Sequence, residues 1–144
     1  MHNEMTHHCK FFTSYFGNSK HVLHDDPDAC LVSIAGITPS WFAGEKFMCL
    51  APKWSWWNEW HSMFKDCIES DESKAWYTEK YTSTVLDKLD AHNVANELAL
   101  LSSCSTIVLM CYETPEKFCH RHIVASWLCS NGISCNEWKQ RNDK

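Results

Sequence analysis

Two uninterrupted apolar segments constrain the fold of this 144-residue chain more than any other feature. They read "ACLVSIAG" at 29–36 and "STIVLMC" at 105–111, and neither alternates between apolar and polar residues. A strand with one solvated face alternates, whereas a strand covered on both faces by helices does not. Both segments therefore predict central strands of an α/β sheet.

Three segments between these strands have helical periodicity, because their apolar residues recur every three or four positions. They are 55–70, 70–89 and 90–101. Ser70 or Asp71 could cap the second helix, and Asp90 could cap the third. Two prolines and a glycine in 37–53 instead predict a long irregular loop, and long loops in compact domains are often functional.

The C-terminal third predicts a strand, a helix and a strand, at 105–111, 119–132 and 133–138. Such a unit implies parallel pairing. Asn131 and Gly132 favour a left-handed end to the helix.

Near the N-terminus, "KFFTSYFGN" (10–18) predicts a short strand that ends in a turn. We therefore expect a single α/β domain with a small, mostly parallel sheet over 10–138. A flexible N-terminus (1–9) would precede it and a polar tail (139–144) would follow it.

Composition narrows the class of protein. The formal charge of -5 gives no general attraction to nucleic acid or membranes, although a local basic pocket is compatible with it. No stretch reaches the roughly 20 apolar residues of a membrane span, and the N-terminus lacks the apolar core of a secretory signal. We therefore expect a cytoplasmic protein. The nine cysteines are odd in number and several lie in apolar stretches, which predicts reduced thiols.

The segment "CYETPEKFCHRH" (111–122) concentrates the residues that could carry chemistry. Cys111 ends a predicted strand, and Cys119, His120 and Arg121 begin the next helix. Ligands of α/β folds gather at such strand ends, and a helix N-terminus favours an anion. Arg121 adds a forked cationic donor, and His120 adds a donor that titrates near neutrality. The segment therefore predicts an anion-binding corner.

Two other interpretations of this segment compete. Cys111, Cys119, His120 and His122 could bind zinc, but structural zinc sites usually show two close ligand pairs, and C-x7-C-H supplies one. We therefore expect neither a metal nor a cofactor. A cysteine before an arginine also resembles a tyrosine phosphatase loop, but that loop is short and glycine-rich, whereas nine residues without glycine intervene here. Arg121 and the helix dipole could still activate Cys111 as a nucleophile.

Several blocks together resemble the bacterial and phage family known as domain of unknown function 488, and most closely a phage-type branch. The segment "LMCYETPEKFCHRHIVASWL" (109–128) matches its C-[YF]-E, C-H-R and apolar helix pattern. "TSYFGN" (13–18), "VSIAG" (32–36) and "LAPK" (50–53) are similar to its other recurrent blocks, in the same order. Where many cellular members carry Asp-x-Arg after the second strand, this chain reads "SIAG".

The resemblance implies a Rossmann-like α/β domain and a pocket, but no particular reaction. The pocket residues that it implies are Thr13, Ser14, Tyr15, Ser33, Gly36, Cys111, Glu113, Cys119, His120 and Arg121. Beside them, Lys53 could contact an anion and Trp54 or Trp56 could form an aromatic wall, whereas Trp57 and Trp60 are expected in the core. Tyr15 or Tyr77 could also offer a flat face.

Three functional hypotheses follow. The first is binding of a phosphate-bearing small molecule, such as a nucleotide or a host signalling nucleotide. Arg121, His120 and Lys53 would contact the anion, and Ser14 and Ser33 would donate hydrogen bonds. The second is an enzyme that acts on a nucleotide or nucleic-acid base, with Cys111 or Glu113 as nucleophile or base and His120 as general acid. The third is a protein-interaction module with exposed tryptophans at Trp41, Trp54 or Trp56. A homo-oligomer is compatible with each.

Overall fold

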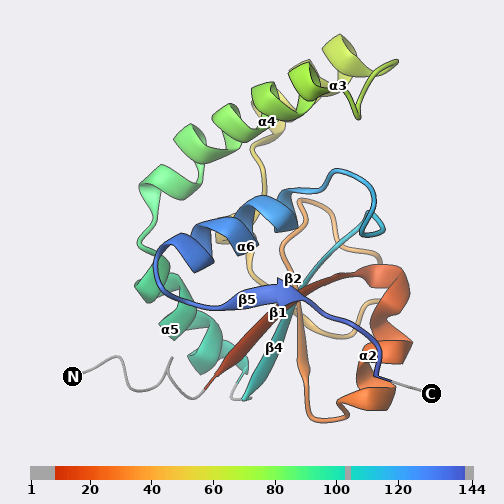
Figure 1. Ribbon diagram of the computed structural model, residues 1–144, viewed down its shortest axis with the longest axis vertical. Coiled ribbons are helices and arrows are strands. Elements are labelled where there is room, and N and C mark those ends of the chain that lie inside the picture. The colour runs from red at the N-terminus through yellow and green to blue at the C-terminus, as the bar shows by residue number, and fades with distance from the viewer. Residues whose placement is uncertain (1–8, 103–104, 142–144) are drawn as a thin grey trace.

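The computed structural model describes residues 9–102 and 105–141, and they form the predicted α/β fold (Figure 1). The strands are β1 (Lys10–Tyr15), β2 (Cys30–Ser33), β3 (Glu45–Lys46), β4 (Thr106–Cys111) and β5 (Cys135–Glu137). The helices are α2 (Ser19–Asp25), α3 (Trp54–Phe64), α4 (Asp71–Thr84), α5 (Ala91–Ser102) and α6 (His120–Ser130). Short 3-10 turns lie at η1 (Phe16–Asn18), η2 (Met48–Leu50) and η3 (Leu86–Lys88).

The sheet is parallel throughout, and its strand order is β3-β2-β4-β1-β5. The middle strand, β4, buries five consecutive side chains from Ile107 to Cys111. Side chains of neighbouring strand residues point to opposite faces, so both faces of β4 are covered. The unbroken apolar run in the sequence therefore correctly predicted a central strand.

The βαβ unit formed by β4, α6 and β5 differs from the expected one in a single respect. All its strands are parallel, but β1 lies between β4 and β5 and pairs with both. Phe11 of β1 is in register with Ile107 on one side and with Cys135 on the other. The two strands of the predicted unit are therefore parallel, as expected, but are not adjacent, because β1 pairs with both of them.

Three elements were missed in the sequence. Helix α2 follows β1 through the turn η1, where only a turn was predicted. The segment 37–53, predicted as irregular, contains the short strand β3 and the turn η2. Strand β3 has two residues, and a segment this short gives no periodic signal, so only its pairing with β2 defines it.

The helix ends follow the predicted local chemistry. Ser70 Oγ accepts a hydrogen bond from the Ser73 amide at 3.1 Å, and Asp90 Oδ1 accepts one from the Asn93 amide at 3.0 Å. Gly132, directly after α6, has a positive φ of 80°, which glycine adopts without steric cost. The second helix ends earlier than expected, at Thr84, and continues as the turn η3.

Helices α3 and α4 form a pair at one end of the molecule, beyond α6 (Figure 1). Aromatic residues hold this pair together. Trp60 Nε1 donates to Ser73 Oγ at 2.9 Å, and the Trp60 and Tyr77 rings meet edge to face at 4.8 Å. Tyr81 donates to the Leu50 carbonyl oxygen at 2.6 Å, which ties α4 to the segment before α3.

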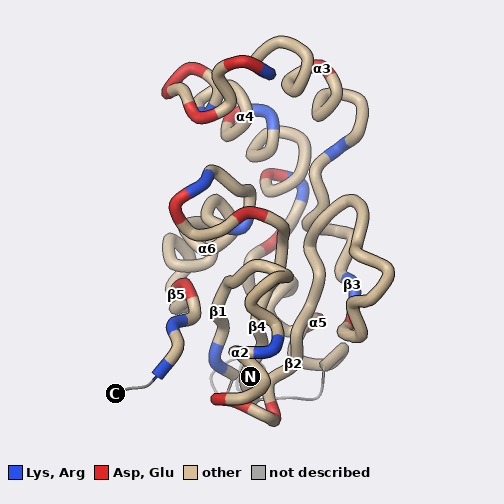
Figure 2. The backbone as a smooth tube through the Cα atoms, turned by 90° about the vertical axis from the view of Figure 1, so that its right-hand side faces the viewer, with Lys and Arg blue, Asp and Glu red and all other residues tan. Residues whose placement is uncertain are grey.

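Lys and Arg are interspersed with Asp and Glu over the described part of the chain and form no continuous basic stripe (Figure 2). None of the helices within 9–102 and 105–141 is long and apolar enough to cross a membrane.

Candidate functional site

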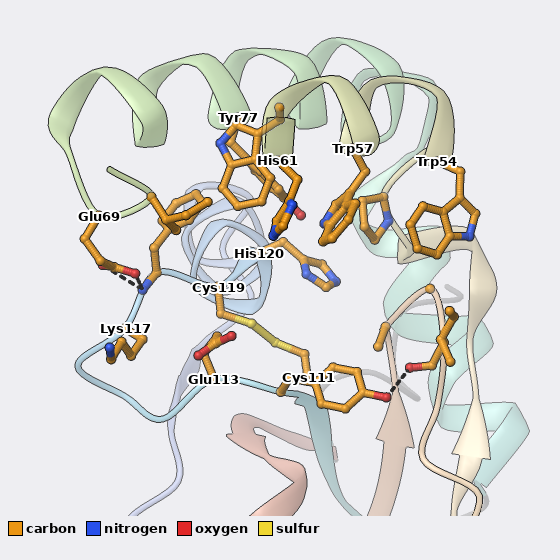
Figure 3. A pocket seen from close by; sticks show the side chains of 18 residues that line it. Trp54, Trp57, His61, Glu69, Tyr77, Cys111, Glu113, Lys117, Cys119 and His120 are labelled. Atoms are coloured by element: carbon orange, nitrogen blue, oxygen red, sulfur yellow. Dashed lines mark hydrogen bonds between the residues drawn. A yellow bond between two sulfur atoms is a disulfide. The ribbon is translucent and has the colours of Figure 1, made fainter. Parts of the chain in front are cut away.

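A cavity of about 620 Å³ lies between the α3–α4 pair and the segment that joins β4 to α6 (Figure 3). Its aromatic wall consists of Trp54, Trp57, Trp60, His61, Tyr77 and Phe118. Its floor is formed by Cys111, Cys119 and His120, and charged side chains reach it from Glu69, Glu113 and Lys117. The cavity therefore opens at the carboxyl end of the central strand, where ligands of α/β folds usually bind.

Part of the aromatic wall is a stripe along one side of helix α3. Trp54, Trp57 and His61 are spaced by three and four residues, so their side chains point in one direction. Trp57 and His61 stack at 10° with centroids 5.0 Å apart, and Trp54 meets Trp57 edge-on at 5.1 Å. Trp57 was expected in the core but lines the cavity. Trp56, considered as a wall residue, is 5 % exposed and does not line it.

His120 lies on the floor of the cavity below Trp57 (Figure 3). Its Nε2 is 2.7 Å from the Ile34 carbonyl oxygen. A carbonyl only accepts, so Nε2 carries the proton and Nδ1 of the neutral ring keeps a lone pair. The pKa of His120 is lowered to about 4, mainly by burial, with the Ile34 hydrogen bond opposing the shift and the Arg121 charge contributing to it. At neutral pH this ring is therefore a hydrogen-bond acceptor toward the cavity and lacks the proton of a general acid.

The two cysteines of the floor are joined. The structure forms a disulfide between Cys111 and Cys119, and Cys30 is also disulfide-bonded. The prediction of reduced thiols is therefore wrong for these three residues. A strand end and a helix start converge here, and spacing along the chain does not reveal such convergence. The thiols of Cys49, Cys67, Cys129 and Cys135 are free.

Arg121 does not line the cavity. Its side chain is fully buried, and Nε and Nη2 donate to the two carboxylate oxygens of Glu137 at 3.1 and 2.8 Å. Nη1 donates to the Glu113 carbonyl oxygen at 2.6 Å. Successive helical side chains diverge by about 100°. Hence His120 faces the cavity while Arg121 packs against the sheet and fixes the loop that carries Glu113.

The other predicted site residues divide into two groups. Those that line the cavity are Gly36, Trp54, Cys111, Glu113, Cys119 and His120. Thr13, Ser14 and Ser33 are buried elsewhere and bonded within the protein, to Glu137, Asn18 and Thr38 respectively. Tyr15 lies over the Arg121 guanidinium at 5.9 Å, and Lys53 precedes α3 without lining the cavity.

Sequence reasoning missed three polar residues of the cavity. Glu69, in the α3–α4 connection, accepts hydrogen bonds from the Phe118 amide at 3.1 Å through both carboxylate oxygens. Lys117 is adjacent, and His61 belongs to the α3 stripe. The helical period of α3 would have placed His61 beside Trp54 and Trp57. Nothing local connects Glu69 with Phe118, which lies 49 residues away.

Three side chains of the floor could hold a metal ion. The ligand atoms offered by Cys111, Cys119 and His120 lie within 4.8 Å of one another, and all three residues are buried. In the described residues no other group of this kind was found.

Comparison with known proteins gives one finding. Neither the curated proteins nor the solved structures contain a significant match to the chain. A family model described as DUF488-N3a, the active DUF488-N3 subclade, matches residues 36–132, which is about two thirds of the chain and includes the floor of the cavity. The chain therefore belongs to the DUF488 family.

Proposed function

We propose that this protein binds a nucleotide or nucleoside derivative in the cavity, with the base against the aromatic wall. The observation that carries the proposal is the row of three contacting rings on α3, Trp54, Trp57 and His61, with the Nδ1 acceptor of His120 beneath them. Flat faces bind a base by stacking, and a single acceptor can orient its exocyclic amine. The side walls are otherwise apolar, as is usual for small-molecule sites.

The anionic part of the ligand would lie at the mouth of the cavity. Lys117 is the cation that lines the cavity among the described residues, and it has the anion-binding role that was predicted for Arg121 and Lys53. Arg121 instead donates a hydrogen bond to the Glu113 carbonyl oxygen, and so it affects the cavity only by holding the loop that carries Glu113 in position. Glu69 and Glu113 add negative charge nearby. This balance favours a nucleoside or a ligand with one phosphate over a polyphosphate.

Calorimetry with a panel of nucleosides and mononucleotides tests the proposal. Trp54→Ala removes a cavity ring that is 49 % exposed, and Trp41→Ala is the matched control because Trp41 is 62 % exposed and lies outside the cavity. Base stacking on an aromatic side chain contributes about 1–3 kcal/mol, so we expect Trp54→Ala to weaken binding roughly 5- to 150-fold. Trp41→Ala should bind as the wild type does.

Two results would overturn the proposal: no heat of binding for any member of the panel, or equal losses in Trp54→Ala and Trp41→Ala. Equal losses would favour the interaction-module hypothesis, in which exposed tryptophans meet a protein partner. The presence of a cavity and the burial of Trp56 already favour the small-molecule hypothesis.

An enzyme that acts on a nucleotide or base is the second candidate, and the observation in its favour is that the matching family model is described as active. Glu113 is its best catalytic residue, because the carboxylate lines the cavity and is solvent-accessible. Cys111 is 1 % exposed and disulfide-bonded, which argues against it as the nucleophile in this form. Chromatography of the calorimetry samples after incubation distinguishes the candidates: product that forms with the wild type and not with Glu113→Gln supports an enzyme.

A further inference from the structure

The cavity floor brings together three potential metal ligands from two elements. Cys111 ends β4, Cys119 precedes α6 and His120 begins it. Their ligand atoms lie within 4.8 Å of one another, and Figure 3 shows them below the aromatic wall. In the sequence they form only one adjacent pair and a distant cysteine. The spacing in the sequence is therefore a weak indication of a metal site, whereas the tertiary structure brings two sulfurs and one imidazole close together.

His120 already has the orientation of a metal-ligating histidine. Such histidines almost always donate their second ring N–H to a carboxylate or a backbone carbonyl, which fixes the ring and its tautomer. The Nε2 of His120 donates to the Ile34 carbonyl oxygen at 2.7 Å, so Nδ1 has the free lone pair. The Tyr81 ring packs against the imidazole with centroids 5.3 Å apart and holds it in place.

The two cysteines are placed to act as thiolate ligands once they are reduced. Arg121 Nη1 lies 3.6 Å from Cys111 Sγ, and a neighbouring guanidinium favours a thiolate. The Cα atoms of Cys111 and Cys119 are 7.3 Å apart, slightly more than the usual disulfide spacing of about 4.4–6.8 Å. This backbone separation has room for an ion between the two side chains.

We propose that the reduced protein binds one Zn²⁺ ion through Cys111 Sγ, Cys119 Sγ and His120 Nδ1, with a fourth coordination position open to the cavity. Two sulfurs and one imidazole suit zinc. A site with three protein ligands and an open position is typical of catalytic zinc, whereas structural zinc is enclosed by four. The ion would therefore face the ligand cavity.

Disulfide formation and metal binding exclude each other because they use the same sulfur atoms. A thiol reductant supplies the two electrons and two protons that convert the disulfide to two thiols, and the reductant is itself oxidised to a disulfide. Zn²⁺ then replaces the two thiol protons, which are released to solvent. The metal alone is the probe of this proposal, so its test does not depend on the nucleotide hypothesis. In the zinc-bound form the ion takes the Nδ1 lone pair, and a base would then be held by the aromatic wall without that acceptor.

Cobalt spectroscopy of the full chain tests the site. After reduction with a phosphine in the absence of oxygen, the wild type should bind one Co²⁺ and show thiolate-to-cobalt charge transfer together with the intense visible bands of tetrahedral Co²⁺. One equivalent of Zn²⁺ should abolish both signals. Cys111→Ser and Cys119→Ser should lose the charge-transfer signal in proportion to the sulfur removed. His120→Gln should weaken Zn²⁺ binding by more than the roughly 10- to 100-fold that loss of an outer partner causes.

Matched controls separate this site from other cysteines and histidines. Cys67→Ser removes an exposed free thiol and should leave the spectrum unchanged. A double variant, His7→Ala with His8→Ala, should also leave it unchanged, although these residues with Cys9 form another possible metal-binding sequence.

Three outcomes would overturn the proposal. The first is that the folded and reduced wild type shows no charge-transfer band. The others are that the air-oxidised wild type, with its disulfide intact, shows the same band, or that a variant without Cys111 and Cys119 keeps the band in full. The comparison of reduced and oxidised wild type needs no substitution, so it decides the question even if the cysteine variants do not fold. If Co²⁺ fails to bind while nucleosides bind normally, only the metal proposal is lost.

Discussion

Arg121 has the largest side chain among the fully buried residues of the described chain, and its charge is balanced inside the domain. The Glu137 carboxylate, which is 19 % exposed, accepts two hydrogen bonds from it. Thr13 donates a further hydrogen bond to the same carboxylate at 2.7 Å. A buried ion pair contributes little net stability compared with apolar residues of similar size. Removing one partner, however, leaves a buried charge without a counter-charge. The pair therefore keeps β5, α6 and the Glu113 loop in one arrangement.

Glu137→Ala should lower the free energy of unfolding by about 3–5 kcal/mol, because the Arg121 guanidinium would remain buried without a counter-charge. Urea denaturation followed by tryptophan fluorescence measures this. Lys74→Ala is the control, because its ion pair with Glu69 is exposed on both sides and should contribute less than about 1 kcal/mol. Equal effects of the two substitutions would contradict this account of the buried pair.

At the scale of elements, helix α4 positions the tyrosines that support the cavity, and its start is fixed by local chemistry. The Ser70 hydroxyl accepts from the Ser73 amide, and Asp71 and Glu72 place negative charge in the first turn. That charge interacts favourably with the positive end of the helix dipole. Ser73 also accepts from Trp60, so the start of α4 is coupled to the tryptophans of α3.

Ser70→Ala should lower the free energy of unfolding by about 1 kcal/mol, within the range of about 0.5–2 kcal/mol known for N-cap substitutions. Thermal denaturation monitored by circular dichroism is the measurement. Ser83→Ala, near the other end of the same helix, is the matched control: its hydroxyl is exposed and bonds only to the Lys80 carbonyl at 3.4 Å. A Ser83→Ala variant as destabilised as Ser70→Ala would show that capping is not the cause.

At the scale of the whole molecule, the segment after β5 closes the fold against α2. Arg141 Nη2 and Nη1 donate to the Asp26 carboxylate at 2.9 and 3.2 Å, and Trp138 Nε1 donates to it at 2.8 Å. These residues are separated by more than 100 positions in the sequence. The hydrogen bonds from Arg141, followed by that from Trp138, hold the pKa of Asp26 below its ordinary value.

This contact should make stability depend on pH. A carboxyl whose folded pKa is depressed stabilises the protein above its unfolded pKa of about 3.9, and the effect is lost as the pH falls through the folded pKa. The wild type should therefore melt at a higher temperature than Arg141→Ala at about pH 7, and this difference should shrink toward zero near pH 2. Lys139→Ala should show no comparable pH-dependent difference. A difference between wild type and Arg141→Ala that stays constant over this range would contradict the assignment.

The sequence by itself determined most of the elements, because the signals that define them are local. The continuous apolar run of 105–111 identifies a strand covered on both faces, and the period within 55–70 identifies helix α3. That helix ends at Phe64, earlier than the pattern predicts, and Met63 of the predicted apolar stripe is exposed. The caps at Ser70 and Asp90 and the left-handed turn at Gly132 depend on neighbouring residues alone. The predicted junction of Cys111 with Cys119 and His120 lies at the floor of the cavity.

Only the tertiary structure decided which side chains meet there. The insertion of β1 between β4 and β5 places Glu137 where it binds Arg121, so the arginine faces the sheet and His120 faces the cavity. The α3–α4 pair brings Trp57 and Glu69 over a floor made by residues about 40 to 60 positions later in the chain. The same packing joins the sulfurs of Cys111 and Cys119. These contacts depend on strand order and helix orientation, which arise from long-range packing energies and not from any local pattern.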